Sequence, residues 1–179
     1  MRTIIVLLGM NVLISSALAQ QSRDQTVAVG SWNIGTTYKA EKFDNCTMSR
    51  TVGDLGISFV RTQDGLLLLL DSPKWKLERG KAYSVRLMAG SQSVDAKALA
   101  ETKGITIALA DRPFNGKLRS ANALDVRGEG TTLRVPLDKS AAAFDRLELC
   151  FEKNGNNGPE TNPFVSPNTN PFVSPNRRP

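Results

Sequence analysis

The fold class is decided by residues 55–71, which read LGISFVRTQDGLLLLLD. Leu55, Ile57 and Phe59 occupy every second position, and this is the period of a pleated strand. The turn residues 63–65, Gln-Asp-Gly, lead directly into Leu66–Leu70, so the stretch predicts a β-hairpin. Five consecutive leucines also suit a helix. However, the run is short and bounded by turn residues, and this favours a strand buried on both faces.

The same alternation recurs along the chain and predicts further strands. It is clear at residues 83–87 and 105–109, and residues 124–126 and 133–137 form a second hairpin around a Gly-Glu-Gly turn. Pro136 donates no backbone hydrogen bond, so we expect an edge strand there or the end of a strand. Two segments stay open: residues 94–101 suit a strand or a short helix, and residues 114–121 suit one or two helical turns.

One helix is predicted near the end of the folded part. Ser140 is a favourable N-cap residue, and Ala143, Phe144, Leu147 and Cys150 recur on one helical face. Many short strands with one closing helix indicate a mainly β protein. We therefore expect an antiparallel β-sandwich, or a partly open barrel, with one C-terminal helix and a disordered tail.

The N-terminus has the pattern of a secretory signal peptide over residues 1–19. Arg2 precedes an apolar run at residues 4–14, and small residues occupy the expected cleavage site. The run is too short for a bilayer, and no second run of membrane length follows. We expect a flexible lead-in at residues 20–30 and a β-rich domain at residues 31–153, located in the periplasm or secreted, with no membrane span.

The only two cysteines are Cys46 and Cys150. An even pair in an exported chain is most simply a disulfide. It would close a loop of about 100 residues and contribute roughly 4–5 kcal/mol in the chain-entropy model. A reactive thiol pair or a metal site is the alternative, but the chain has no C-x-x-C spacing and no His. The bridge would join the C-terminal helix to an early strand.

The tail, residues 154–179, has a different composition and an internal repeat. The octapeptide TNPFVSPN occurs at residues 161–168 and again at 169–176. Its proline content excludes a helix, so we expect a disordered or extended tail. Asn162-Pro163-Phe164 and Asn170-Pro171-Phe172 would each present a Phe on a turn. They resemble the NPF motif that eukaryotic EH domains bind, and a duplicated spacer explains them equally well.

A basic segment around Lys74, Trp75 and Lys76 is the second candidate binding site. In strand geometry Trp75 would face one side and the two lysines the other. One interpretation is a basic edge for an acidic protein or an anionic envelope component. The other is a core Trp beside solvated lysines that protect an edge strand. The formal net charge is +6; export argues against nucleic acid as a partner, and the charge also serves solubility.

No catalytic or cofactor motif is recognisable. The absence of His removes Ser–His and Cys–His nucleophiles and imidazole metal sites. The chain lacks S-x-x-K, G-x-G-x-x-G, Walker and EF-hand sequences. Paired carboxylates remain formally available. We expect no enzyme activity, no cofactor and no metal.

The chain resembles small exported proteins of Gram-negative bacteria and, more distantly, the invasion-associated locus B family. The resemblance covers roughly residues 32–150. It rests on Trp32, Phe43, Cys46, the segment Pro73-x-Trp75-x-Leu77-x-x-Gly80, residues 118–126 and Leu147-x-x-Cys150. It implies a β-sandwich in the periplasm or envelope with a link to host-cell invasion, and it implies no site residue. The single cysteine pair and the NPF tail depart from that family.

Three functions therefore remain open from the sequence. The first is an exported binding module of the envelope or host interface, which requires an exposed aromatic or basic patch on the folded domain. The second is a structural or stress-related periplasmic protein without a specific ligand, which requires no such patch. The third is a hydrolase that uses carboxylates alone, which requires a cleft with two close Asp or Glu groups.

Overall fold

A computed structural model describes residues 26–155 of the protein. The predicted signal peptide (residues 1–19) and the repeats (residues 161–176) lie outside the described residues. The elements are β1 Val27–Val29, β2 Trp32–Lys39, β3 Lys42–Val52, β4 Leu55–Thr62, β5 Gly65–Asp71, β6 Ala82–Ala89, β7 Gln92–Ala100, β8 Gly104–Leu109, α1 Arg112–Leu118, β9 Ala123–Arg127, β10 Thr132–Pro136 and α2 Ser140–Gly155.

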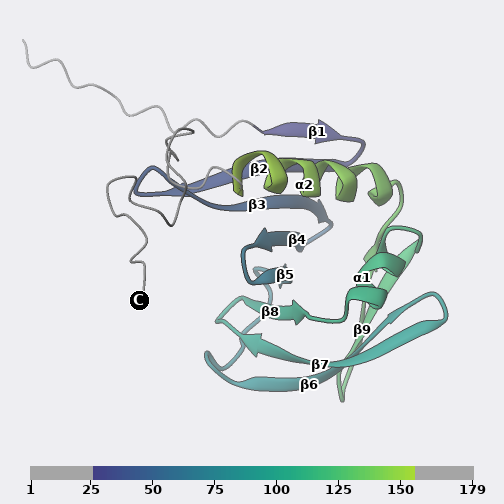
Figure 1. Ribbon diagram of the computed structural model, residues 1–179. Coiled ribbons are helices and arrows are strands. Elements are labelled where there is room, and N and C mark those ends of the chain that lie inside the picture. Colours follow the sequence, from purple (N-terminus) through teal and green to yellow (C-terminus); the bar gives the residue numbers. More distant parts are fainter. Residues whose placement is uncertain (1–25, 156–179) are drawn as a thin grey trace, which may run out of the picture.

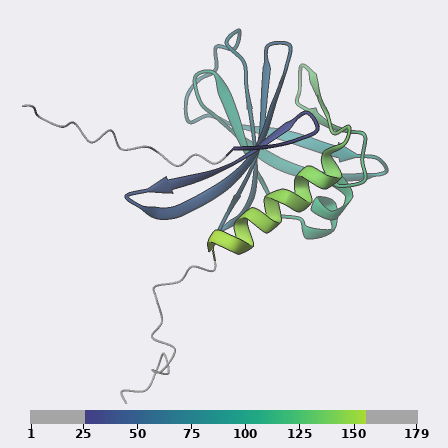
Figure 2. The ribbon, with the colours of Figure 1, turned by 90° about the horizontal axis from the view of Figure 1, so that it is seen from above.

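The ten strands form one antiparallel sheet in the order β1-β2-β3-β4-β5-β8-β7-β6-β9-β10. The sheet is strongly curved, and the strands fan out in the view from above (Figures 1 and 2). Since β1 and β10 are its two edges and do not pair, the sheet stays unclosed. The predicted mainly β fold is confirmed, in the form of a single open sheet.

The β4–β5 hairpin forms as its sequence predicts. Thr62 pairs with Gly65 across the turn, and Phe59 pairs with Leu68. Leu68 and Leu70 are fully buried on the inner face, whereas Leu67 and Leu69 are half-buried on the outer face. The expectation that this strand is buried on both faces is wrong, because both helices pack on the inner side of the sheet.

The two ambiguous segments are resolved by their packing. Residues 94–100 belong to β7, which pairs with β6 along most of its length. Residues 112–118 form α1, which buries Phe114 and Leu118. The Asp111 carboxylate caps α1 by accepting a hydrogen bond of 2.7 Å from the Phe114 backbone N–H. Pro136 ends β10 at the edge of the sheet, as expected.

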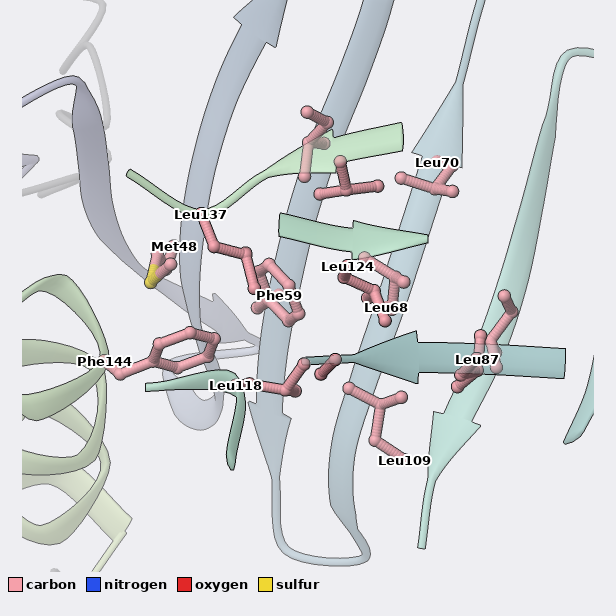
Figure 3. Close-up of a cluster of buried hydrophobic side chains, with 14 of the residues drawn as sticks. Met48, Phe59, Leu68, Leu70, Leu87, Leu109, Leu118, Leu124, Leu137 and Phe144 are labelled. Atoms are coloured by element: carbon pink, nitrogen blue, oxygen red, sulfur yellow. The ribbon is translucent and has the colours of Figure 1, made fainter. Parts of the chain in front are cut away.

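The core lies between the concave face of the sheet and the two helices, and Figure 3 shows its central side chains. Phe144 of α2 meets Phe59 of β4 edge to face, with ring centroids 4.9 Å apart. The ring of Trp32 on β2 also contacts Phe59, with ring centroids 6.0 Å apart. α2 packs mainly on β2 and β3, and α1 packs on β6 and β7 (Figure 1). Each helix therefore covers a different end of the sheet.

Both boundaries of the domain differ slightly from expectation. The strand Val27–Val29 pairs with β2, so the sheet begins within the segment expected to be a lead-in (residues 20–30). α2 begins at Ser140 as predicted, but the buried Ser140 hydroxyl has no hydrogen-bond partner within residues 26–155, so the N-cap assignment is wrong. The helix continues two residues past Lys153, to Gly155. Its last turn is held by Asn154, whose Nδ2 donates to the Cys150 carbonyl at 2.8 Å.

Candidate functional site

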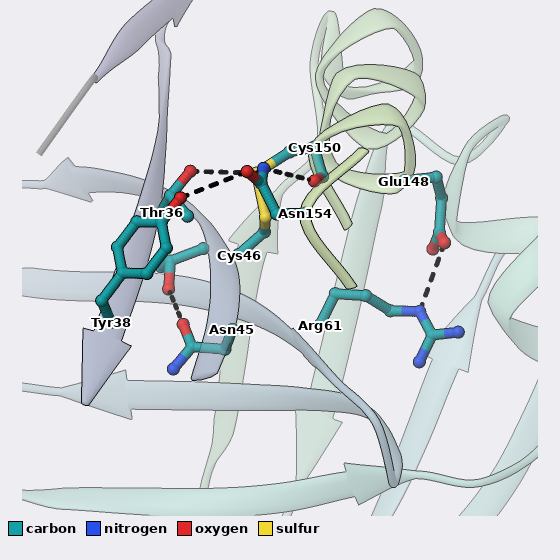
Figure 4. The surroundings of a disulfide bond; sticks show 9 residues. Thr36, Tyr38, Asn45, Cys46, Arg61, Glu148, Cys150 and Asn154 are labelled. Carbon is teal, nitrogen blue, oxygen red and sulfur yellow. Dashed lines mark hydrogen bonds and ion pairs between the residues drawn. A yellow bond between two sulfur atoms is a disulfide. The ribbon is translucent and has the colours of Figure 1, made fainter. Parts of the chain in front are cut away.

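The predicted disulfide joins Cys46 of β3 to Cys150 of α2 (Figure 4). The two Cα atoms lie 6.2 Å apart and are separated by 104 positions in the sequence. Cys46 is completely buried, and the Thr36 hydroxyl lies 3.3 Å from the Cys150 sulfur in a hydrogen bond. A buried bridge that ties the last helix to the sheet has a structural role.

An aromatic cluster of Tyr38, Phe43 and Phe151 lies beside the disulfide. Tyr38 and Phe43 meet edge to face at 6.3 Å, and Phe43 and Phe151 lie 5.7 Å apart. Arg61 stacks over Phe151 at 4.4 Å and forms an ion pair of 3.2 Å with Glu148. Tyr38 is 47% exposed, whereas Phe43 and Phe151 are partly buried against the core, so the cluster reaches the surface mainly through Tyr38. No local pattern in the sequence indicates this cluster, because β2, β3 and α2 meet only in the fold.

The basic segment Lys74–Lys76 is not a strand. It forms a turn followed by an irregular segment, and this segment lies against the β7–β8 connection. The Leu77 backbone N–H donates a hydrogen bond of 3.1 Å to the Thr102 carbonyl in that connection. Trp75 is partly buried against the core, whereas both lysines are exposed. Lys74 forms an ion pair with Asp54. The prediction that this segment is a strand is therefore wrong. The predicted difference in exposure between Trp75 and the two lysines is nevertheless observed.

The remaining predicted site residues, in the two NPF repeats, lie outside the described part of the chain. Within residues 26–155, no group of three or more His, Cys, Asp or Glu side chains is arranged to hold a metal ion. Neither described helix combines the length and the apolar character needed to cross a membrane. The candidate sites in the described domain are therefore two surface grooves that the sequence did not indicate.

The larger groove, called the β7 groove below, has a volume of about 1170 Å³. Residues 84–87, 94–97, 108–111 and 127–129 line it together with Phe114. Its apolar side chains include Val85, Leu87 and Leu109, which are part of the core. The groove is thus a place where the apolar interior of the open sheet reaches the surface.

The β7 groove exists because the sheet forks. β6 pairs with β7 from Gln92 to Leu99, but β8 pairs only with Ala98–Ala100. Beyond Ile107, β8 continues to Leu109 and pairs with β5 alone, and the chain then turns into α1, which Asp111 caps. Among the described strands, residues 92–97 therefore have a neighbour on one side only. An unpaired strand edge offers backbone donors and acceptors to an added strand.

The rim of the β7 groove carries an ion pair between neighbouring strands. The Arg86 guanidinium donates to the Asp95 carboxylate, with an Nε–Oδ1 distance of 2.8 Å. This hydrogen bond and the charge of Arg86 hold the pKa of the Asp95 carboxyl below its usual value of 3.8. The same contact raises the pKa of Arg86. Both groups therefore stay charged at neutral pH and are exposed at the rim.

The smaller groove, called the hairpin groove below, has a volume of about 570 Å³. Its apolar lining includes Leu66, Leu67, Leu109 and Phe144. The other lining residues are Arg61, Gln63, Asp64, Gly65, Ala108, Ala110, Arg112, Asn115, Gly116, Arg119 and Glu148. It lies between the β4–β5 turn, α1 and α2, and it shares residues 108–110 with the β7 groove. Its volume is within the range of about 300–1,000 Å³ that is typical of ligand pockets.

One polar atom in the hairpin groove has an unmet hydrogen-bonding requirement. The Asn115 side chain donates from Nδ2 to the Leu109 carbonyl at 2.7 Å. Its Oδ1 is buried and has no hydrogen-bond partner among residues 26–155. Buried polar atoms in native proteins nearly always find a partner. A ligand that carries an N–H or O–H group would complete this site.

Comparison with known proteins supports the fold. No family model matches the chain, and no curated protein matches it. Among solved structures, the crystal structure of invasion associated protein B from Bartonella henselae superposes with a TM-score of 0.52 at 20% sequence identity. The match covers 72% of this chain and 97% of that chain. The resemblance expected from the sequence is thus confirmed at the level of structure: the chain shares its fold with invasion associated protein B.

Proposed function

We propose that the protein is an exported, non-catalytic binding module of the bacterial envelope or host interface, and that the β7 groove holds its partner. The observation that carries the proposal is the fork in the sheet, which leaves one edge of residues 92–97 without a neighbouring strand, beside an apolar groove. An extended peptide segment is the ligand that fits both features, because its backbone would pair with β7 while its apolar side chains enter the groove.

The ionisable groups of the groove support binding rather than catalysis. Asp95 is paired with Arg86, and Asp111 accepts the hydrogen bond that begins α1. Neither of these two carboxylates is available as a general acid or base without breaking that contact, and Glu129 is the one lining carboxylate without such a contact among the described residues. The rim carries both positively and negatively charged side chains, whereas the interior of the groove is apolar. This combination favours a partner with both polar and apolar groups.

Export of the protein is part of the proposal, and two observations support it. The N-terminal pattern is that of a signal peptide, and a buried disulfide forms and persists in oxidising compartments. The similarity to a protein whose name is invasion associated supports the host interface as the place of action in this proposal. Whether the protein remains in the periplasm or is released is tested by fractionation of the producing cells.

Site-specific photocrosslinking tests the binding function. A photoreactive residue would replace Ala96 in the β7 groove or, as a matched control, the exposed Thr51 of β3. Both proteins would be irradiated in envelope and host-cell extracts. We expect adducts from position 96 that excess unlabelled protein suppresses, and none from position 51. Equal labelling at the two positions, or no adduct at either, would reject the β7 groove as a binding site and favour a structural role.

A further inference from the structure

We propose that the protein's own C-terminal segment, residues 156–179, docks in the hairpin groove through the phenylalanines of its repeats. The proposal concerns the neighbouring groove, which shares only residues 108–110 with the one proposed for external partners. It rests on where the described chain ends, on the chemistry of the groove, and on the composition of the segment that follows.

The described chain ends beside the hairpin groove. Gly155 lies close to the side chains of Gln63 and Phe43. A Cβ atom added at Gly155 would lie 3.4 Å from the Gln63 Nε2 and 3.4 Å from the Phe43 ring. Gln63 is itself a lining residue of the groove. Phe164 follows Gly155 by nine positions. A fully extended segment of this length spans at most about 30 Å. The first repeat is therefore within reach of the groove, and the second follows eight positions later.

The groove and the repeats match in chemistry. The groove offers the apolar side chains of Leu66, Leu109 and Phe144 and one buried acceptor, the Asn115 Oδ1. Each repeat supplies an adjacent Phe-Val pair flanked by Asn and Ser residues that carry donors. One aromatic side chain buries roughly 150–250 Å², and one donor would satisfy the Asn115 oxygen.

Weak intrinsic affinity is sufficient for docking, because the ligand is attached. A short flexible connection gives an effective concentration on the order of millimolar. An intrinsic dissociation constant of about 1 mM would therefore leave the groove occupied in about half of the molecules. Two copies of the repeat double the local concentration of the Phe side chain that would enter the groove. The duplication would therefore increase the fraction of molecules in which the groove is occupied.

Amide NMR spectra of the chain without residues 1–19 test the proposal. The double variant F164A/F172A removes both rings, and S166A/S174A is the matched control in the same two repeats. We expect the first variant, and not the control, to shift the amide signals of Gly65, Leu67 and Gly116. Identical signals at these positions in all three proteins would overturn the proposal. Shifts that grow with protein concentration would indicate binding between two copies and would also overturn it.

A variant in the groove tests the same contact from the other side. A Cβ atom on Gly116 meets nothing within 4 Å, so Gly116→Gln leaves the fold intact and places a side chain at the mouth of the groove. We expect the signals of Phe164 and Phe172 to move to the positions found in a synthetic peptide of residues 156–179. Unchanged signals would reject docking here. Gly116 does not line the β7 groove, so this outcome is independent of the crosslinking at position 96.

Discussion

Phe144 on α2 and Phe59 on β4 meet edge to face across the core, with centroids 4.9 Å apart. Both rings are buried, and this contact connects the last helix to the centre of the sheet. An edge-to-face pair adds about 0.5–1.5 kcal/mol to the stabilisation that comes from the buried area of its two rings, so this contact helps to hold α2 on the sheet.

Replacing Phe144 by Ala should therefore destabilise the protein by about 3–5 kcal/mol, the usual range for a buried Phe. Leu149 is the control, because it lies on the same helix and is 54% exposed. Leu149→Ala should change the free energy of unfolding by less than about 0.5 kcal/mol. Denaturant unfolding of both variants measures the difference. Equal effects would contradict the inward orientation of the Phe144 face of α2.

The disulfide should be present and stabilising in the protein isolated without reductant. Intact mass measured without reductant should be lower by two hydrogens than the fully reduced mass, because both cysteines are bridged. The double variant C46A/C150A should lose about 2–5 kcal/mol of unfolding free energy, because the loop it opens spans 104 positions. Thr36→Val, which removes only the hydrogen bond to the Cys150 sulfur, should lose much less. Free thiols in freshly isolated protein would contradict the bridge.

Two glycines should respond in opposite directions to the same substitution. Gly116 lies within α1, and a Cβ atom there has open space around it, so Gly116→Ala should stabilise the protein by about 0.5–1 kcal/mol. Gly104 begins β8, where a Cβ atom would lie 3.0 Å from the Leu70 backbone oxygen. Gly104→Ala should destabilise the protein, since that backbone is fixed in the sheet. Thermal unfolding of the two variants should show Tm changes of opposite sign.

The Arg86–Asp95 pair predicts a defined dependence on acid. Because the folded pKa of Asp95 lies below its usual value of 3.8, the stabilising contribution is complete at pH values above 3.8. It is lost as the pH falls through the lowered folded pKa. In Arg86→Gln, the pKa of Asp95 measured by carboxyl NMR should rise toward its usual value. The lowered pKa of Asp44, whose largest cause is its hydrogen bond with Lys39, should stay unchanged and serves as the internal control.

The elements whose signals are local could be predicted from the amino-acid sequence. The β4–β5 hairpin follows from alternating apolar residues on either side of a Gln-Asp-Gly turn, and α2 follows from the spacing of Phe144 and Leu147. Both depend on neighbours in the chain, so periodicity and turn chemistry are enough to predict them. The disulfide could be predicted for another reason: the chain has two cysteines and an N-terminus with the pattern of a signal peptide, so only one pairing is available.

Only the tertiary structure decided the features that depend on distant residues. The placement of β8 between β5 and β7, and the fork that exposes residues 92–97, result from pairings that no local pattern specifies. The segment around Trp75 is irregular because its backbone bonds to the β7–β8 connection instead of to a strand. The two grooves likewise arise where strand pairing ends and a helix begins. Sequence patterns encode which face a side chain prefers, whereas the geometry of a groove depends on which strands meet there.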